Sequence, residues 1–148
     1  MEVTLVRAMR NDVNEYIRIG RLVISRFNTV ATNPDDVLKE LEESIVQLIR
    51  VDGRVIGFIS YKIPAAWKHA YISEVQVEPD FQGRGIGGQA LAMVLEAFST
   101  FEVVDLHTHP QNPAQRMYAR HGFVATGEII ENYEDTGEPR MRMLLKRP

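Results

Sequence analysis

Hydrophobic and polar positions alternate along this chain with two different periods, that of a strand and that of a helix. Val3 and Leu5 alternate with polar neighbours, which predicts a first strand. Apolar residues at helical spacing then predict one helix after Asp12 and a second after Asn33-Pro34, a helix cap followed by a first-turn proline. The apolar positions are Val13, Tyr16, Ile17, Ile24 and Phe27 in the first helix, and Val37, Leu38, Leu41 and Ile45 in the second.

The rest of the chain predicts more strands and two further helices. Asp52-Gly53 is a strong signal for a two-residue hairpin. A helix begins near Gln89, and a short helix runs from Asn112 to a stop at Gly122. The predicted strands cover residues 46–51, 55–61, 70–77, 102–107, 123–130 and 140–145.

Length supports one domain rather than two. At 148 residues the chain can bury one core but is too short for two domains of ordinary size. Residues 1–148 are therefore predicted to form a single α/β domain, with a mixed, mostly antiparallel sheet flanked by helices and a strand–glycine loop–helix site. The loop of residues 63–69, which carries Trp67, falls between two of the strands.

Composition excludes several classes of function. The net charge of −3 argues against nucleic acid as the main ligand. No apolar run is long enough to span a bilayer and no signal peptide is visible, so we expect a cytoplasmic protein with no membrane partner. The absence of cysteine excludes disulfides, thiolate metal ligands and a cysteine nucleophile.

A glycine-rich stretch between a strand and a helix is the most informative segment. It places four glycines within residues 83–88. Glycines let the backbone turn sharply and bring its N–H groups close to a ligand. The helix start that follows adds unpaired donors and the positive end of the helix dipole. The segment is therefore suited to hold an anion, and phosphate fits best.

A dinucleotide-binding fold is one alternative reading of this stretch. Gly83, Gly85 and Gly88 match the pattern G-x-G-x-x-G, and Asp105 lies about twenty residues further on, as that fold requires. In the dinucleotide fingerprint the first glycine directly follows the strand, whereas here five residues intervene. No Lys-Ser or Lys-Thr pair follows the glycines, which excludes a P-loop. An oxidoreductase is thus the weaker alternative.

The stretch from Val77 to Gly87 closely resembles the acetyl-CoA-binding motif of the GNAT superfamily of N-acetyltransferases, Arg/Gln-x-x-Gly-x-Gly/Ala. Gln82, Gly85 and Gly87 occupy its defining positions. A second motif of that family, an Asn before a short helix that carries Tyr and ends in Gly-Phe, is matched by residues 112–123. The order and spacing of the two motifs also resemble the family.

The resemblance implies that acetyl-CoA is the acyl donor and that no metal is needed. The strand before the glycine loop would offer its backbone to the pantetheine arm, and the loop N–H groups would cradle the pyrophosphate. Arg84 would meet a phosphate or stay a solvated charge, and Asn112 would contact the cofactor or only cap its helix. The implied cofactor-binding residues are Val75, Val77, Gln82, Gly83, Arg84, Gly85, Ile86, Gly87, Gly88 and Asn112.

The resemblance further implies direct attack of a primary amine on the thioester in a ternary complex. Tyr118 would lie near the leaving sulfur; tyrosine (pKa ~10) is a weaker acid than a thiol (~8.5), so a hydrogen bond is as good a role as proton transfer. Packing alone is the other interpretation of Tyr118. Glu74 would be the general base, or a plain surface glutamate. His107 and His109 lie two apart, but with no carboxylate pattern beyond Asp105 we expect no metal there.

Partners follow from the same resemblance. The expected acceptor is an amine of a small molecule or of a protein, and homodimers are common among relatives. A non-catalytic acyl-CoA-binding or sensor module on the same fold is the alternative function, in which acetyl-CoA would bind without turnover. The distinguishing residue is Tyr118, which such a module would not need.

Overall fold

A single seven-stranded sheet runs through the chain in the order β1-β2-β3-β4-β5-β7-β6. The computed structural model describes residues 2–63 and 68–147. Only β4 and β5 pair in parallel, and every other neighbouring pair is antiparallel, which confirms the mixed, mostly antiparallel sheet. The strands are β1 (Val3–Arg7), β2 (Ile45–Val51), β3 (Arg54–Lys62), β4 (His69–Val77), β5 (Val103–Thr108), β6 (Val124–Ile130) and β7 (Arg140–Lys146).

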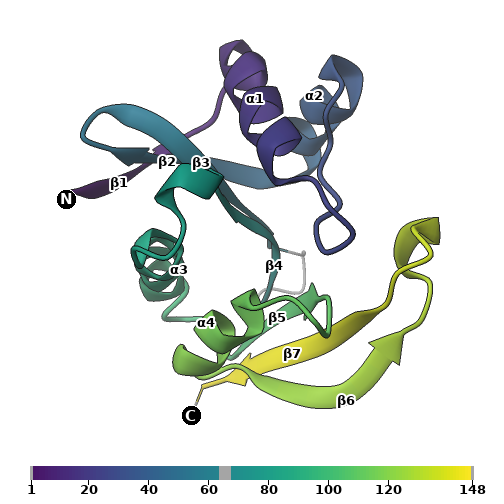
Figure 1. Ribbon diagram of the computed structural model, residues 1–148. Helices are drawn as coiled ribbons and strands as arrows, with labels where there is room; N and C mark the ends of the chain where they lie inside the picture. Colours follow the sequence, from purple (N-terminus) through teal and green to yellow (C-terminus); the bar gives the residue numbers. More distant parts are fainter. Residues whose placement is uncertain (1, 64–67, 148) are drawn as a thin grey trace.

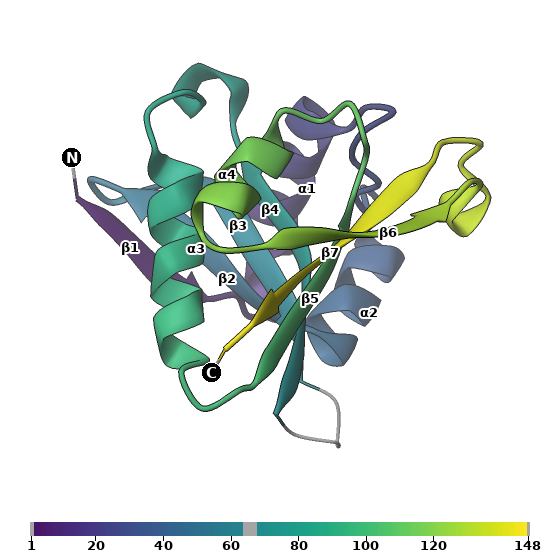
Figure 2. The same ribbon diagram turned by 90° about the horizontal axis from the view of Figure 1, so that it is seen from below.

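Helices cover both faces of the sheet. Figures 1 and 2 show α1 and α2 on one face and α3 and α4 on the other. One apolar cluster lies beneath α1 and α2, and two others join the opposite face to α3 and α4. The helices are α1 (Val13–Val23), α2 (Pro34–Glu43), α3 (Ile86–Ala97) and α4 (Ala114–Arg120).

Local signals in the sequence explain several element ends. Asp52 and Gly53 both have positive φ, +50° and +83°, which is the conformation that a tight hairpin between β2 and β3 requires. The Asn33 side chain accepts a hydrogen bond from the Asp36 N–H at 3.0 Å and caps α2. Gly122 ends α4 with φ +95°. These predicted ends are confirmed.

Two helix boundaries differ from the prediction. Helix α1 ends at Val23, so the expected continuation through Ile24 and Phe27 is wrong. The backbone turns away from helical geometry at Ile24, whose ψ is 130°, and the returning chain packs on Gly20, where an added Cβ would lie 3.0 Å from Val30 Cγ1. Helix α3 begins at Ile86, three residues before the predicted start, and therefore includes two of the glycines.

Trp67 lies outside the described residues, so its loop has no structural account here. Within residues 2–63 and 68–147, no helix is long and apolar enough to cross a membrane.

Candidate active site

Strands β4 and β5 pair over only part of their length and then separate. Their parallel register runs from His69↔Val103 to Ile72↔Leu106. Beyond that point β5 continues beside β7, while β4 continues beside β3 alone. Among the described residues, 73–77 of β4 therefore have no strand on their β5 side. Their free backbone groups can pair with an extended ligand in the way an added strand would.

Helix α3 sits directly against this unpaired part of β4. A Cβ added at Gly87 would lie 3.6 Å from Val77 Cγ2, 3.8 Å from Val75 Cγ1 and 3.4 Å from Met117 Sδ. The missing side chain lets the first turn of the helix approach the strand closely. The predicted residues Val75, Val77 and Gly87 are thus brought together, with the two valine side chains packed toward α3.

The glycine loop owes its shape to backbone conformation. Gly83 and Gly85 have φ of +77° and +79°, a region that L side chains rarely adopt, yet a Cβ at either position would meet nothing within 4 Å. Glycine is needed here for its dihedral angles and not for space. The loop lies at the surface, directly before α3.

A row of backbone donors follows from this conformation. The first helical bond of α3 runs from the Gln89 N–H to the Gly85 carbonyl at 3.0 Å. Within the described part of the chain, the N–H groups of residues 83–88 have no acceptor. Consecutive free N–H groups at the positive end of a helix dipole form a site for phosphate. Ile86 and Gly88, predicted for this role, belong to that row.

Gln82 plays a different part from its neighbours. Its N–H donates to the Pro79 carbonyl at 3.3 Å, and its Nε2 donates to the Val77 carbonyl at 2.9 Å. The side chain therefore fastens the loop to the end of β4. This contact accounts for the glutamine in the motif through positioning.

Arg84 extends outward from the same loop. Its guanidinium carbon lies 5.2 Å from the centroid of the Phe81 ring. No carboxylate pairs with Arg84 in the described residues, so its charge is available to an anion held by the loop.

The second motif builds the wall opposite the splayed strand. Asn112 Oδ1 accepts from the Ala114 N–H at 3.0 Å, directly before α4, in which Pro113 is the N-cap residue. Tyr118 follows on the buried side of α4, with its ring 5.9 Å from that of Phe123. In the described residues its hydroxyl has no hydrogen-bond partner. Burial and then the charge of Glu74 raise the pKa of Tyr118.

A cavity of about 560 Å³ lies between the two walls. Glu74, Val75, Asn112 and Tyr118, which the sequence analysis singled out separately, all line it. The glycine loop does not line the cavity; it continues from the far end of the splayed strand. Other polar and aromatic lining residues come from α1, α2, β4, β5, the segment before β7 and β7 itself, and they include Tyr16, Asp36, Lys39, Glu40, Glu43, Tyr71, His107, Tyr133, Glu134 and Arg140.

Glu74 combines partial burial with a titration near neutrality. It points to the face opposite Val75, and Gln76 Nε2 donates to its Oε2 at 2.6 Å. Burial raises the pKa of Glu74 to about 8; the Gln76 hydrogen bond opposes this rise, and Glu40 adds to it. A carboxyl with a pKa in this range can take and release a proton at neutral pH.

Several residues that line the cavity do not belong to either sequence motif. The Tyr71 hydroxyl lies 2.8 Å from His107 Nδ1, and the His107 and Tyr133 ring centroids are 5.7 Å apart. His107 Nε2 is buried without a partner in the described residues. Tyr71 lies on the same predicted strand as Glu74 and Val75, but the sequence does not show which element faces it.

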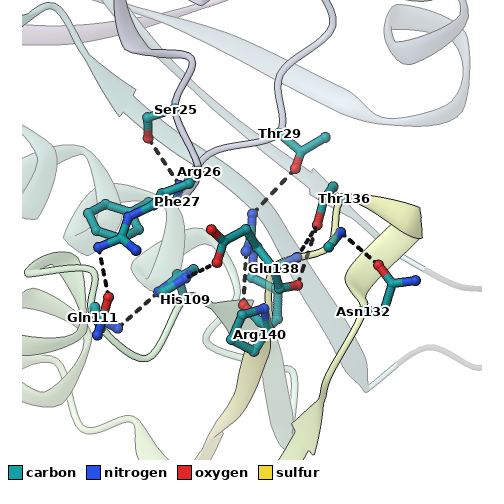
Figure 3. A network of polar contacts seen from close by, with 12 residues as sticks. Ser25, Arg26, Phe27, Thr29, His109, Gln111, Asn132, Thr136, Glu138 and Arg140 are labelled. Atoms are coloured by element: carbon teal, nitrogen blue, oxygen red, sulfur yellow. Dashed lines mark hydrogen bonds and ion pairs between the residues drawn. The ribbon is translucent and has the colours of Figure 1, made fainter.

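His109 and Arg140 belong to a polar network beside the cavity, drawn in Figure 3. His109 Nε2 lies 3.0 Å from Glu138 Oε2, and its Nδ1 accepts from the Gln111 N–H at 3.0 Å. Its two nitrogens are thus both engaged, and it does not share a ligand set with His107. No group of His, Asp or Glu in the described residues has the arrangement of a metal site.

Both the sequence and the fold of this chain are similar to those of known proteins. Residues 12–123 match the sequence model of the acetyltransferase (GNAT) family. The chain is 29% identical over 132 residues to S-(2-succino)cysteine N-acetyltransferase of Bacillus subtilis (strain 168), a match that covers 82% of this chain and 77% of that protein.

Two solved structures illustrate the likeness of fold. Ard1 from Thermoplasma volcanium has a TM-score of 0.81 at 22% identity, covering 100% of this chain and 99% of the other. The PaiA N-acetyltransferase from Thermoplasma acidophilum, in complex with coenzyme A, has a TM-score of 0.75 at 17% identity, covering 99% of this chain and 100% of the other.

Proposed function

Because the chain belongs to the acetyltransferase (GNAT) family, and is an acyltransferase, we propose that it moves an acetyl group from acetyl-CoA to a primary amine by direct attack in a ternary complex. One observation carries this proposal. The free N–H groups of residues 83–88 and the unpaired edge of β4 lead from the surface into the cavity that Glu74 and Tyr118 line.

Acetyl-CoA fits this path as the donor substrate. The N–H groups of residues 83–88 would hold its pyrophosphate, with Arg84 adding charge from the rim. The amides of the pantetheine arm would pair with the backbone of residues 73–77. Laid along these groups, the thioester reaches the cavity, where the acceptor amine meets it.

Glu74 acts as the general base in this proposal. An amine in water arrives largely as an ammonium ion, which cannot attack a carbonyl carbon. Glu74, whose pKa is raised to about 8 by burial, takes the proton from the amine, directly or through one water. The neutral nitrogen then bonds to the carbonyl carbon of the thioester.

Tyr118 stabilises the group that leaves. As the tetrahedral intermediate collapses, the carbon–sulfur bond breaks and the electron pair goes to sulfur. The Tyr118 hydroxyl keeps its proton because burial raises its pKa, and it donates a hydrogen bond to the thiolate. The attacking nitrogen loses a second proton to solvent as the intermediate collapses, so the products are an N-acetyl amide and CoA, whose thiolate is afterwards protonated from solvent.

The acceptor is proposed to be a small molecule. A cavity of about 560 Å³ is in the size range of small-molecule sites. The Bacillus subtilis relative, at 29% identity, is named for a small-molecule acceptor, S-(2-succino)cysteine. A protein amine is the competing possibility, and a protein acceptor would have to insert its amine into the same cavity.

Release of CoA in a panel of amines tests the proposal. The panel holds amino acids, amino acid amides, polyamines and peptides with a free N-terminus, each assayed with acetyl-CoA. Turnover of any amine supports the enzyme. Binding of acetyl-CoA with no turnover of any amine would favour the sensor module.

Intact mass spectrometry separates direct transfer from a covalent route. The sequence has no cysteine, and we expect no acetyl adduct on the protein after incubation with acetyl-CoA alone. An adduct that disappears on addition of a turned-over amine would refute direct attack.

A further inference from the structure

Arg140 is a buried cation in the cavity wall. Its exposed fraction is 4%, although it lines the cavity together with Glu74. Its guanidinium donates to the Pro139 carbonyl at 2.9 Å and to the Thr29 hydroxyl at 3.3 Å, as Figure 3 shows. Both of these acceptors are neutral. Within the described residues, no carboxylate forms an ion pair with Arg140.

A buried arginine without an anion is costly. The guanidinium stays charged at every relevant pH, and removing a charge from water is unfavourable unless an opposite charge compensates it. Arg142, two residues further along β7, shows the usual solution. Its guanidinium lies 2.8 Å from Asp105 Oδ2 and 3.4 Å from Glu128 Oε2.

The acidic groups around Arg140 do not supply this compensation. Glu138 is directed to His109, at 3.0 Å. Glu74 Oε2 accepts a hydrogen bond from Gln76 Nε2 at 2.6 Å, and within the described residues Glu74 forms no ion pair with Arg140. Asp36, Glu40, Glu43 and Glu134 also line the cavity, but none of them forms an ion pair with Arg140 within the described residues. The guanidinium carbon of Arg140 lies 5.4 Å from the centroid of the Tyr133 ring. The negative charge is therefore expected from a ligand.

We propose that Arg140 binds a carboxylate of the acceptor, which makes the acceptor an amino acid or another amine that carries a carboxylate close to its nitrogen. Arg140 and Glu74 line one cavity and are near enough for the arginine charge to lower the pKa of Glu74, against the larger effect of burial. Arg140 would hold the carboxylate, and Glu74 would receive the proton of the amine. This inference rests on the proposed acetyl transfer and specifies its acceptor.

Matched acids and amides test the inference with the unaltered protein. An amino acid and its amide share the amine and the side chain, and only the carboxylate differs. The amide has the less basic amine, so intrinsic reactivity at neutral pH favours the amide, and a preference for the acid must come from binding. We expect kcat/KM for the acid to exceed that for the amide by roughly 30-fold or more, the usual effect of losing one partner of a buried charge pair.

The outcomes of this comparison separate the inference from the proposed function. Turnover of amides or polyamines at least as efficiently as of acids would overturn the role of Arg140 and leave acetyl transfer standing. No CoA release with any amine would instead remove the proposed function.

Two variants on the same strand assign the preference to a residue. In Arg140→Gln, the ratio of kcat/KM for the acid to kcat/KM for the amide should fall to about one, mainly through a higher KM for the acid, and this ratio cancels any change in Glu74 that both substrates share. Arg142→Gln also removes an arginine of β7, but one that is paired with Asp105, and should keep the preference for the acid. Retention of that preference in a folded Arg140→Gln protein would refute the assignment.

A binding measurement covers the case in which Arg140→Gln does not fold. A carboxylic acid that lacks the amine should compete with the amino acid in the unaltered protein, because it fills the Arg140 site. The corresponding amine without a carboxylate should compete at least about 10-fold more weakly. Equal competition by the two would contradict the proposal.

Discussion

At the scale of single residues, the proposed chemistry depends on two side chains whose pKa values are raised by burial in one cavity. For Glu74 the shift places a carboxyl near neutrality, where it can exchange a proton with an amine. For Tyr118 the shift keeps the hydroxyl protonated, so that it serves as a donor. The same physical cause thus gives opposite roles to two groups.

Replacing Glu74 should change how the rate depends on pH. In the unaltered enzyme, kcat/KM for the amine should rise with pH and level off above about 8, because Glu74 must be ionised to accept a proton. Glu74→Gln should lower kcat by roughly 10²-fold or more and leave only the rise that comes from deprotonation of the amine itself. An unchanged rate and an unchanged pH–rate profile in the variant would show that Glu74 is not the general base.

The same residue should make stability depend on pH. The folded pKa of about 8 lies above the ordinary value of 4.5, so the folded protein binds more protons than the unfolded chain between these values. The contribution of Glu74 to stability is therefore fully present below pH 4.5 and falls as pH rises through 8. The Tm of Glu74→Gln relative to the unaltered protein should increase from pH 5 to pH 9, and a constant difference would contradict the raised pKa.

Tyr118→Phe removes one oxygen and keeps the ring that packs α4. The thiolate exists only in and after the transition state, so the loss should fall on kcat, by roughly 10²–10⁴-fold, with the affinity for acetyl-CoA nearly unchanged. Stopped reactions with a confirmed acceptor measure the first quantity, and thermal shift with acetyl-CoA measures the second. A variant with near-full kcat would leave Tyr118 as a packing residue only.

At the scale of elements, the unit that matters is β4, the glycine loop and the start of α3. The strand ends without a partner on one side, the loop turns at Gly83 and Gly85, and the helix begins with free N–H groups. Gly87 lets the helix lie against the strand. The proposed ligand-binding groups of this unit are backbone N–H and C=O groups. Their positions depend on the backbone conformation and not on the identity of a side chain.

Gly85 and Gly53 allow this dependence to be tested with matched variants. Both have positive φ, +79° and +83°, and a Cβ at either would meet nothing within 4 Å. Alanine at either position should therefore cost about 1–2 kcal/mol of stability from backbone strain alone. Only Gly85→Ala should also lower the affinity for acetyl-CoA, by about 10-fold or more, because only the loop that contains Gly85 would hold the pyrophosphate. Affinity for acetyl-CoA is measured by calorimetry. Equal affinity of the two variants would show that the glycine loop does not bind the pyrophosphate.

At the scale of the whole molecule, the cavity exists because two halves of the sheet diverge. α1 and α2 cover one side of it, while α4, β5 and β7 form the other, so acetyl-CoA would bind along the line where these halves meet. A ligand that binds only the folded protein stabilises it by mass action. At about a hundred times its dissociation constant, acetyl-CoA should add about 2.7 kcal/mol. Absence of a thermal shift at millimolar acetyl-CoA would contradict the donor assignment.

Elements with local causes could be predicted from the sequence. The Asp52-Gly53 hairpin and the Asn33 cap depend on residues next to one another, and the structure confirms both. The end of α1 could not be predicted from periodicity, because apolar residues continue at helical spacing to Phe27, whereas the chain after Val23 turns back and packs Val30 on Gly20. The predicted start of α3 was too late because glycine disfavours a helix on propensity alone, whereas Gly87 and Gly88 belong to the first turn, where Gly87 packs against β4.

The sequence by itself determined the mixed sheet, the order of its elements and the glycine loop, because periodicity, turn residues and motif spacing are written within short stretches of chain. Only the tertiary structure decided where β4 and β5 part, and that Glu74 and Tyr118 face one cavity. The tertiary structure also decided that Arg140 is buried and, within the described residues, has no carboxylate as ion-pair partner. Burial, pKa and charge compensation depend on neighbours from distant elements, and no local pattern encodes those neighbours.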